Sequence, residues 1–114
     1  MNFKLKHNLK ERLSESDKIK LKYPKRVPVI IEKRDGCILN QIDKTKYLVP
    51  NDLNMNQLIY IIRKRINLSN SQSLFFMVND HICPSNTPLG IIYENHKDKD
   101  GFLYIIYTSE NTFG

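Results

Sequence analysis

The stretch Val27-Pro28-Val29-Ile30-Ile31-Glu32 decides the fold, because it is short, apolar and rich in β-branched residues, which predicts a β-strand. Successive side chains of a strand point to opposite faces, so one face carries Val27, Val29 and Ile31 and the other carries Pro28, Ile30 and Glu32. Asp35-Gly36 then signals a turn, and Tyr47-Leu48-Val49, closed by Pro50, predicts a second, very short strand. We therefore expect a strand pair whose second member is short.

The segment after this pair predicts the most regular helix of the chain. Asn54 followed by Gln57 is a helix-capping signature, since each can satisfy a free N–H group at a helix start. Apolar residues then recur at helical spacing: Met55, Leu58, Ile59, Ile61, Ile62 and Ile66. A strand, strand, helix order results.

The last third of the chain predicts two strands with a helix between them. Residues 74–79 form a continuous apolar run that is typical of a buried strand. Thr87-Pro88 predicts an N-cap and a first-turn proline for a helix that ends at about His96. Asp100-Gly101 predicts a turn into the final strand, residues 102–107.

The N-terminal segment predicts a helix that precedes the sheet. Ser14 and Asp17 have the spacing of a capping box, and Pro24 disfavours helical geometry at Tyr23, so we expect a helix that starts at Ser14 and ends near Tyr23. The whole order describes an α+β domain with one helix across one face of a mixed sheet, as in a β-grasp. At 114 residues the chain suffices for one compact core.

The charge of the chain lies almost wholly at its front. Residues 1–26 hold nine Lys and Arg residues against three acidic residues, so this segment carries the entire net charge of +6. A basic segment of this kind can contact nucleic acid, an anionic membrane surface or an acidic protein, or can be a solvated helix face. The basic residues are not interleaved with aromatic stacking platforms, which disfavours nucleic-acid binding.

The sequence offers no enzyme chemistry and no cofactor or metal site. The three histidines lack a second ligand type at metal spacing, and the chain has neither a glycine-rich phosphate loop nor a pair of catalytic carboxylates. Cys37 and Cys83 are far apart, so we expect two free thiols. The longest apolar runs are far shorter than the roughly 20 residues that span a bilayer, and the N-terminus lacks a signal-peptide pattern. A cytosolic protein is expected.

Four separated segments resemble one known family. They are residues 22–33 (KYPKRVPVIIEK), 43–50 (DKTKYLVP), 62–66 (IRKRI) and 97–114, which begins KDKDGFLY and ends ENTFG. Together they resemble the autophagy ubiquitin-like modifiers, the GABARAP and light chain 3 group. The resemblance implies a ubiquitin-like β-grasp with two extra N-terminal helices. It divides the chain into a helical extension (1–24), a core (25–108) and a flexible conjugation tail (109–114).

The resemblance also implies that Gly114 is activated as a thioester by ubiquitin-like activating and conjugating enzymes and then joined to phosphatidylethanolamine. A deconjugating cysteine protease is the further implied partner. Family members usually carry one or more residues after this glycine, which the protease removes, whereas this sequence stops at Gly114. Two explanations stay open, a gene that ends here and a chain that is already trimmed, and with either one the chain is expected to be ready for activation. The implied locations are the cytoplasm and, after lipidation, autophagosomal or related membranes. The alternative is an unconjugated adaptor that uses the basic N-terminal helices on acidic tubulin tails or vesicle proteins.

The second implied activity is the binding of receptor peptides that carry an aromatic residue and, three positions on, an aliphatic one. A short edge strand at residues 46–49 can accept such a peptide as an added strand. By position in the family, the aromatic pocket is expected from Glu15, Ile19, Pro28, Ile30, Lys46, Leu48 and Phe102. The aliphatic pocket is expected from Tyr47, Val49, Pro50, Leu53, Leu58 and Ile61, with Arg65 nearby for acidic flanking residues. The chain departs from the usual family pattern at Asn8, Asn56 and Leu58.

Overall fold

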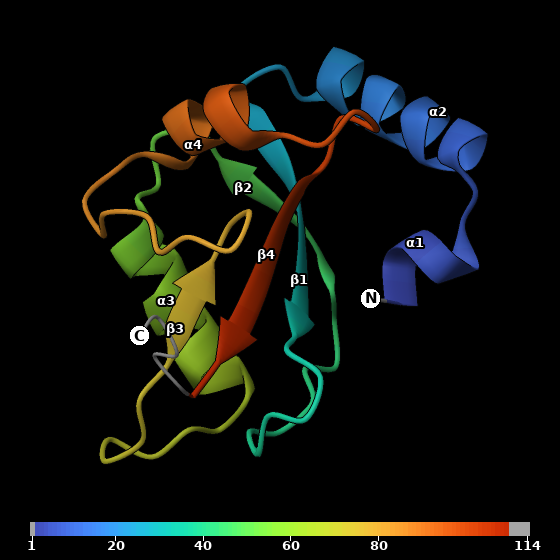
Figure 1. The fold of residues 1–114 in the computed structure, drawn as a ribbon. Coiled ribbons are helices and arrows are strands. Elements are labelled where there is room, and N and C mark those ends of the chain that lie inside the picture. Colours follow the sequence, from blue (N-terminus) through green and yellow to red (C-terminus); the bar gives the residue numbers. More distant parts are fainter. Residues whose placement is uncertain (1, 110–114) are drawn as a thin grey trace.

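The computed structural model of the chain describes residues 2–109, and its centre is a four-stranded mixed sheet (Figure 1). The strands are β1 (Arg26–Lys33), β2 (Lys46–Pro50), β3 (Phe75–Met77) and β4 (Leu103–Thr108), in the order β2-β1-β4-β3. β1 pairs antiparallel with β2 and parallel with β4. The expected strand pair and the mixed β-grasp sheet are therefore confirmed, with β2 as an edge strand. The conjugation tail from residue 110 onward lies outside the described residues.

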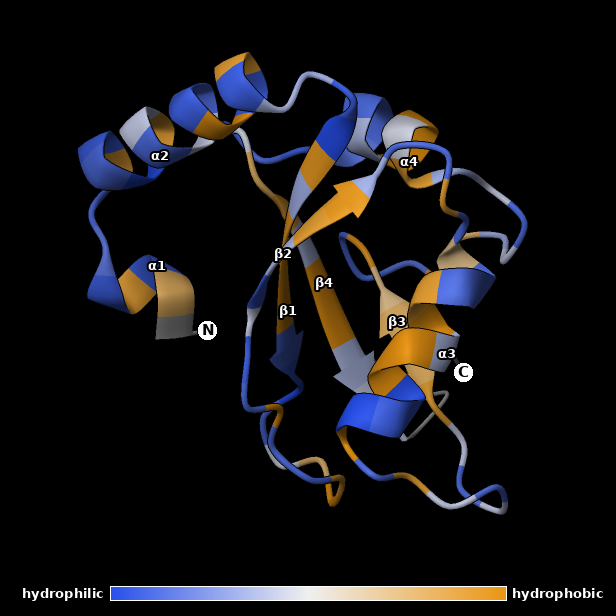
Figure 2. Cartoon of the chain, turned by 180° about the vertical axis from the view of Figure 1, so that it is seen from behind, coloured by the Kyte–Doolittle hydropathy of each residue, from blue (hydrophilic) through white to orange (hydrophobic). Residues whose placement is uncertain are grey.

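Helix α3 (Met55–Arg65) covers one face of the sheet. Its start is the expected capping box, because Asn54 accepts a hydrogen bond from Gln57 N–H and Gln57 accepts one from Asn54 N–H, both at 2.9 Å. Alternate residues of β1 and β4 and the inner side of α3 form the main core: Val27, Val29, Ile31, Leu103, Ile105, Tyr107, Met55, Leu58 and Ile62. Figure 2 shows hydrophobic colouring along β4 and α3, as this core requires.

The opposite face of the sheet is covered by α1 (Asn2–Lys6) and α2 (Leu9–Lys22), which lie on the other side of β1 from α3 (Figure 1). Phe3 of α1 packs with Ile30 and Phe102 in a second, smaller apolar cluster, and Ile19 of α2 packs against it. The two extra N-terminal helices are thus present. The chain itself supplies the cover for Ile30, which is 0% exposed.

The predicted start of the N-terminal helix at Ser14 is wrong. Helix α2 begins at Leu9, and its capping box is formed by Asn8 and Glu11, whose side chains each accept the other's backbone N–H at 2.9 Å. Asn8 has the extended backbone of an N-cap, whereas Ser14 lies inside the helix. Asn8 and Glu11 have the same spacing as Ser14 and Asp17, so spacing alone does not distinguish the two possible helix starts. The helix ends at Lys22, before Tyr23 and Pro24, as expected.

Helix α4 (Leu89–His96) also begins differently from the prediction, because Pro88 and not Thr87 is its N-cap. No side chain caps it; the N–H groups of Leu89 and Gly90 donate instead to the carbonyl oxygens of Leu53 and Asn51, at 2.8 and 2.9 Å. A loop next to β2 therefore takes the place of a capping side chain.

Two strand boundaries differ from the predictions as well. β3 is shorter than residues 74–79, because Asn79 and Asp80 have positive φ and form a two-residue turn that returns the chain at once. β4 begins one residue later than Phe102, after Gly101, which has the positive φ of +88° expected of a turn glycine.

Candidate functional site

The edge strand β2 offers backbone hydrogen-bonding groups to an added strand. It has one strand neighbour, β1, within residues 2–109. Ile31 N–H donates to Thr45 O at 2.7 Å, and in an antiparallel ladder every second residue bonds to the same neighbour. The backbone groups of Lys46 and Leu48 therefore point to the free edge. Arg26, which was not among the predicted site residues, reaches this edge and donates from Nη1 to Leu48 O at 3.3 Å.

The residues of the predicted aromatic pocket gather on the α2 side of this edge, but they differ in exposure. Lys46 is exposed, the half-buried members are Glu15, Ile19 and Leu48, and the buried members are Pro28, Ile30 and Phe102. Ile30 and Phe102 are 0% exposed, so they can form only the floor of such a pocket, beneath Ile19. The Lys46 ammonium pairs with the Glu15 carboxylate, which joins the exposed rim of β2 to α2.

The residues of the predicted aliphatic pocket gather on the α3 side of the same edge. Val49 and Leu58 are buried, Tyr47 and Leu53 are half-buried, and Pro50, Ile61 and Arg65 are exposed or nearly so. Ile61 is 44% exposed and is the most accessible apolar side chain of this set apart from Pro50. Leu58 packs in the main core, so it contributes a floor and not a rim.

Tyr47 and Arg65 are held at the end of this surface by polar contacts. Arg65 Nε donates to the Asp43 carboxylate at 3.1 Å, and its guanidinium lies 5.8 Å from the centre of the Tyr47 ring. The Tyr47 hydroxyl donates to Lys44 O at 2.6 Å. Burial raises the pKa of Tyr47 to about 12, so its hydroxyl stays a donor at physiological pH. Arg65 already has an acidic neighbour, which an acidic peptide residue would have to replace.

Two surface hollows can be compared with the predicted pockets. One, of about 500 Å³, is lined by residues of α1, β1, β3, α4 and β4 and of the adjoining loops, among them Lys4, Met77 and Tyr104. Another, of about 410 Å³, lies along α3 and is lined in part by Tyr60 and Ile61. It shares only Ile61 with the predicted aliphatic pocket, so this hollow extends that surface along α3.

Metal ligands and thiols are the other groups of chemical interest among the described residues. Within residues 2–109, no group of three or more His, Cys, Asp or Glu side chains is placed to hold a metal ion. Cys37 and Cys83 are free thiols. Burial raises the pKa of Cys83; burial acts in the same direction on Cys37, but hydrogen bonds with Leu39 and Ser109 outweigh it and lower the Cys37 pKa. In the same range, every helix is too short or too polar to cross a membrane.

Comparison with known proteins identifies the family. A family profile described as "Autophagy protein Atg8 ubiquitin like" matches residues 11–114. Autophagy-related protein 8b of Arabidopsis thaliana is 49% identical over 113 residues, which are 99% of this chain and 93% of that protein. Autophagy-related protein 8 of Mycosarcoma maydis is 47% identical over 112 residues, 98% of this chain and 95% of that protein. The solved structure of Trypanosoma brucei ATG8 matches with a TM-score of 0.91 at 38% identity and covers 100% of this chain and 98% of that one. The chain therefore belongs to the Atg8 family of autophagy ubiquitin-like proteins, as the sequence resemblance implied.

Proposed function

We propose that this protein is a modifier that is joined through the Gly114 carboxyl group to the amine of phosphatidylethanolamine and then binds receptor peptides along β2. The family is one of ubiquitin-like modifiers and adaptors, which supports a modifier over a catalyst. The conjugate forms in the cytoplasm and acts on autophagosomal or related membranes, where it contributes to membrane expansion and recruits cargo receptors.

The conjugation step consists of activation followed by three acyl transfers. The Gly114 carboxylate attacks ATP to give an acyl adenylate and pyrophosphate, and the thiol of the activating enzyme displaces AMP to give a thioester. The thiol of the conjugating enzyme then takes over the acyl group and frees the first thiol, and the lipid amine displaces the second thiol to give an amide. β4 ends at Thr108, so residues 109–114 can reach at most about 20 Å from the sheet when fully extended. A glycine at the end of such an arm has no side chain to obstruct a narrow enzyme channel. The two acyl chains would then anchor the domain to a bilayer.

The arrangement of side chains at β2 is the observation that carries the peptide-binding function. Residues three positions apart on a strand point to opposite faces, because side chains alternate. A peptide added to β2 would therefore send its aromatic residue to one face of the sheet and its aliphatic residue to the other. The positions of Leu48, on the α2 side of the sheet, and of Ile61, on α3, support one pocket on each of these two faces.

The conjugation step is tested with matched activating and conjugating enzymes, ATP and liposomes, with intact mass as the readout. Wild type is expected to gain one phosphatidylethanolamine, and Gly114→Ala is expected to gain none. Liposomes of phosphatidylcholine are the matched control, because its quaternary amine cannot form an amide. Absence of a wild-type adduct, with enzymes active on another substrate, would favour the unconjugated adaptor that uses the basic helices.

Peptide binding is tested by calorimetry with an aromatic-x-x-aliphatic peptide. Leu48→Ala and Ile61→Ala are each expected to weaken binding by roughly 1–3 kcal/mol, the usual cost of emptying a central contact. Ile82→Ala is the matched control, because Ile82 is 43% exposed against 44% for Ile61 but lies beyond β3, at the other edge of the sheet. Equal affinities for wild type and both pocket variants would contradict the assignment of the groove.

A further inference from the structure

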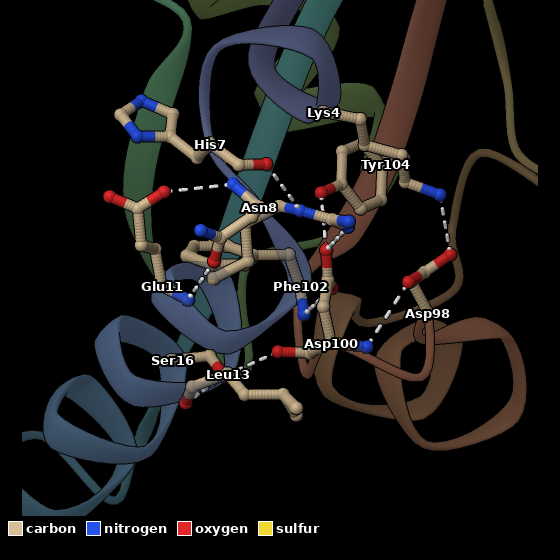
Figure 3. Close-up of polar contacts among 11 residues, drawn as sticks. Lys4, His7, Asn8, Glu11, Leu13, Ser16, Asp98, Asp100, Phe102 and Tyr104 are labelled. Atoms are coloured by element: carbon tan, nitrogen blue, oxygen red, sulfur yellow. Dashed lines mark hydrogen bonds and ion pairs between the residues drawn. The ribbon is translucent and has the colours of Figure 1, made fainter.

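A buried carboxylate ties α2 to the segment before β4. The Asp100 side chain is 0% exposed and accepts three hydrogen bonds, from Arg12 Nη1 at 2.7 Å, the Tyr104 hydroxyl at 2.5 Å and Phe102 N–H at 2.9 Å (Figure 3). Arg12 is the α2 member of this network, and its side chain is 11% exposed. Burial and the hydrogen bond to Asp100 both raise the pKa of Tyr104, so this hydroxyl remains a donor. We call Arg12, Ser16, Asp100 and Tyr104 the α2 clamp.

Ser16 adds a second tie one helical turn further along α2. Its hydroxyl donates to Asp100 O at 2.5 Å, and Ser16 itself is buried (Figure 3). The approach is so close that a Cβ at position 101 would lie 2.9 Å from Ser16 Cβ and nearer still to its hydroxyl oxygen. Gly101 therefore permits contact between the helix and the backbone of this segment. Because Arg12 and Ser16 are both tied to Asp100, the clamp fixes how far α2 lies from the segment before β4 and how the helix is rotated about its own axis.

Two further residues of α2, Glu15 and Ile19, lie beside the clamp residues on the same face of the helix, because Glu15 is three positions after Arg12 and Ile19 is three positions after Ser16. Glu15 and Ile19 are four residues apart and share a side of the helix. Glu15 pairs with Lys46 of β2, but the two side chains are 34% and 45% exposed, and pairs of this kind contribute little to stability. Ile19 also packs against Phe3, Ile30 and Phe102, so the clamp and this apolar contact together set where Glu15 and Ile19 lie relative to β2.

We propose that Arg12 and Asp100 are positioning residues for peptide binding: the clamp holds α2 at the spacing from β2 that admits the aromatic side chain of a docked peptide. This inference rests on the peptide-binding function proposed above. Arg12 does not touch the peptide and acts through Ile19 and Glu15. The aliphatic side of the groove is built on α3 and does not depend on α2.

The test compares three peptides by calorimetry: the parent, one with Ala for the aromatic residue and one with Ala for the aliphatic residue. The loss of affinity of each Ala peptide relative to the parent peptide gives a separate penalty for the aromatic residue and for the aliphatic residue. Arg12→Met is expected to weaken the parent peptide about tenfold, within the range of coupling between members of one network. The penalty for the aromatic residue should shrink by a similar factor, and the penalty for the aliphatic residue should stay unchanged. Arg12→Lys, which keeps the charge, should restore part of the aromatic penalty.

Two further variants keep the result interpretable. Ser16→Ala removes one tie without removing a charge and should reduce the aromatic penalty in the same direction, even if Arg12→Met folds poorly. Arg63→Met is the matched control, because Arg63 donates to the carbonyl oxygens of Ser69 and Gln72, at 2.9 and 2.8 Å, away from α2. It should leave both penalties unchanged.

The outcomes separate this inference from the function on which it rests. Wild-type binding with unchanged aromatic penalties in Arg12→Met, Arg12→Lys and Ser16→Ala would overturn the positioning role and leave peptide binding intact. An equal fall of both penalties would also overturn it, since the clamp would then act only on general stability. Failure of wild type to bind the parent peptide would overturn both.

Discussion

Truncation of Phe102 should damage the fold before it damages peptide binding. The family resemblance assigns Phe102 and Leu48 to one pocket, but in the structure the two side chains differ in exposure. Phe102 is 0% exposed and packs edge-on against Phe3, with 5.1 Å between the ring centres. Leu48 is half-buried on an edge strand. Phe102→Ala should therefore act mainly on the stability of the fold, and Leu48→Ala should act mainly on the affinity for the peptide.

The magnitude follows from this difference in burial. Truncation of a buried Phe to Ala typically costs about 3–5 kcal/mol, through lost burial and the cavity left behind. That is a large share of the roughly 5–15 kcal/mol by which a domain is stable. At about 4 °C per kcal/mol for a domain of this size, Phe102→Ala should lower the thermal midpoint by at least about 12 °C. Leu48→Ala should cost at most about 1.5 kcal/mol, since only part of its side chain leaves water on folding.

Urea denaturation of both variants checks these values, with an unchanged slope against denaturant as evidence that the folded state is comparable. Calorimetry with a receptor peptide, at a temperature where both variants are folded, supplies the binding half of the test. Phe102→Ala with a loss of stability below about 1 kcal/mol would refute the assignment of Phe102 to the floor. So would a Leu48→Ala variant that is destabilised as much as Phe102→Ala.

Three further predictions concern the elements around α1 and α2. Gly101→Ala should cost at least about 2 kcal/mol in urea denaturation, because φ at this position is +88° and the new Cβ would collide with α2; a near-neutral result would contradict the close approach. Asn8→Ala should lose about 0.5–2 kcal/mol as a cap substitution, whereas Ser14→Ala should change stability by less than about 0.5 kcal/mol, and the reverse order would favour a helix start at Ser14. Burial acts to raise the pKa of Asp98, but the hydrogen bonds from Lys4 and from Asp100 N–H, together with the charges of Lys4 and Arg12, outweigh it and lower this pKa below 3.8. The resulting stabilisation of α1 is present above that pH and is lost as pH falls through the lowered value. The side-chain carboxyl resonance of Asp98 should therefore titrate in acid below about pH 4, and Lys4→Met should move its midpoint upward; a transition near neutral pH would contradict the assignment.

The elements that local chemistry specifies were predictable from the sequence. The cap at Asn54 and the alternation of side chains along β1 depend on residues a few positions apart, so both can be predicted without knowledge of the fold. The starts of α2 and α4 were not predictable in the same way. Ser14 and Asn8 both offer a capping pattern, and the N–H groups of α4 are satisfied by a loop more than 30 residues earlier in the chain. Only the folded arrangement decides between such alternatives.

In the candidate site, too, the sequence pattern predicts on which face of the sheet a residue lies, whereas packing decides how exposed its side chain is. Ile30 and Leu48 are both apolar and lie on the same face of the sheet, so the sequence gives no reason to treat them differently. They differ because Phe3 and Ile19 cover Ile30 and leave Leu48 half-exposed. That cover depends in turn on where α2 lies, and α2 is held by the polar residues of the α2 clamp, which no apolar periodicity reveals. A signal was nevertheless present: Arg12 and Ser16 stand four residues apart on α2, where a helix that only covered a core would carry apolar side chains. Polar residues at inward positions of an amphipathic helix therefore indicate a specific buried partner, and in this protein that partner is the turn at Asp100-Gly101.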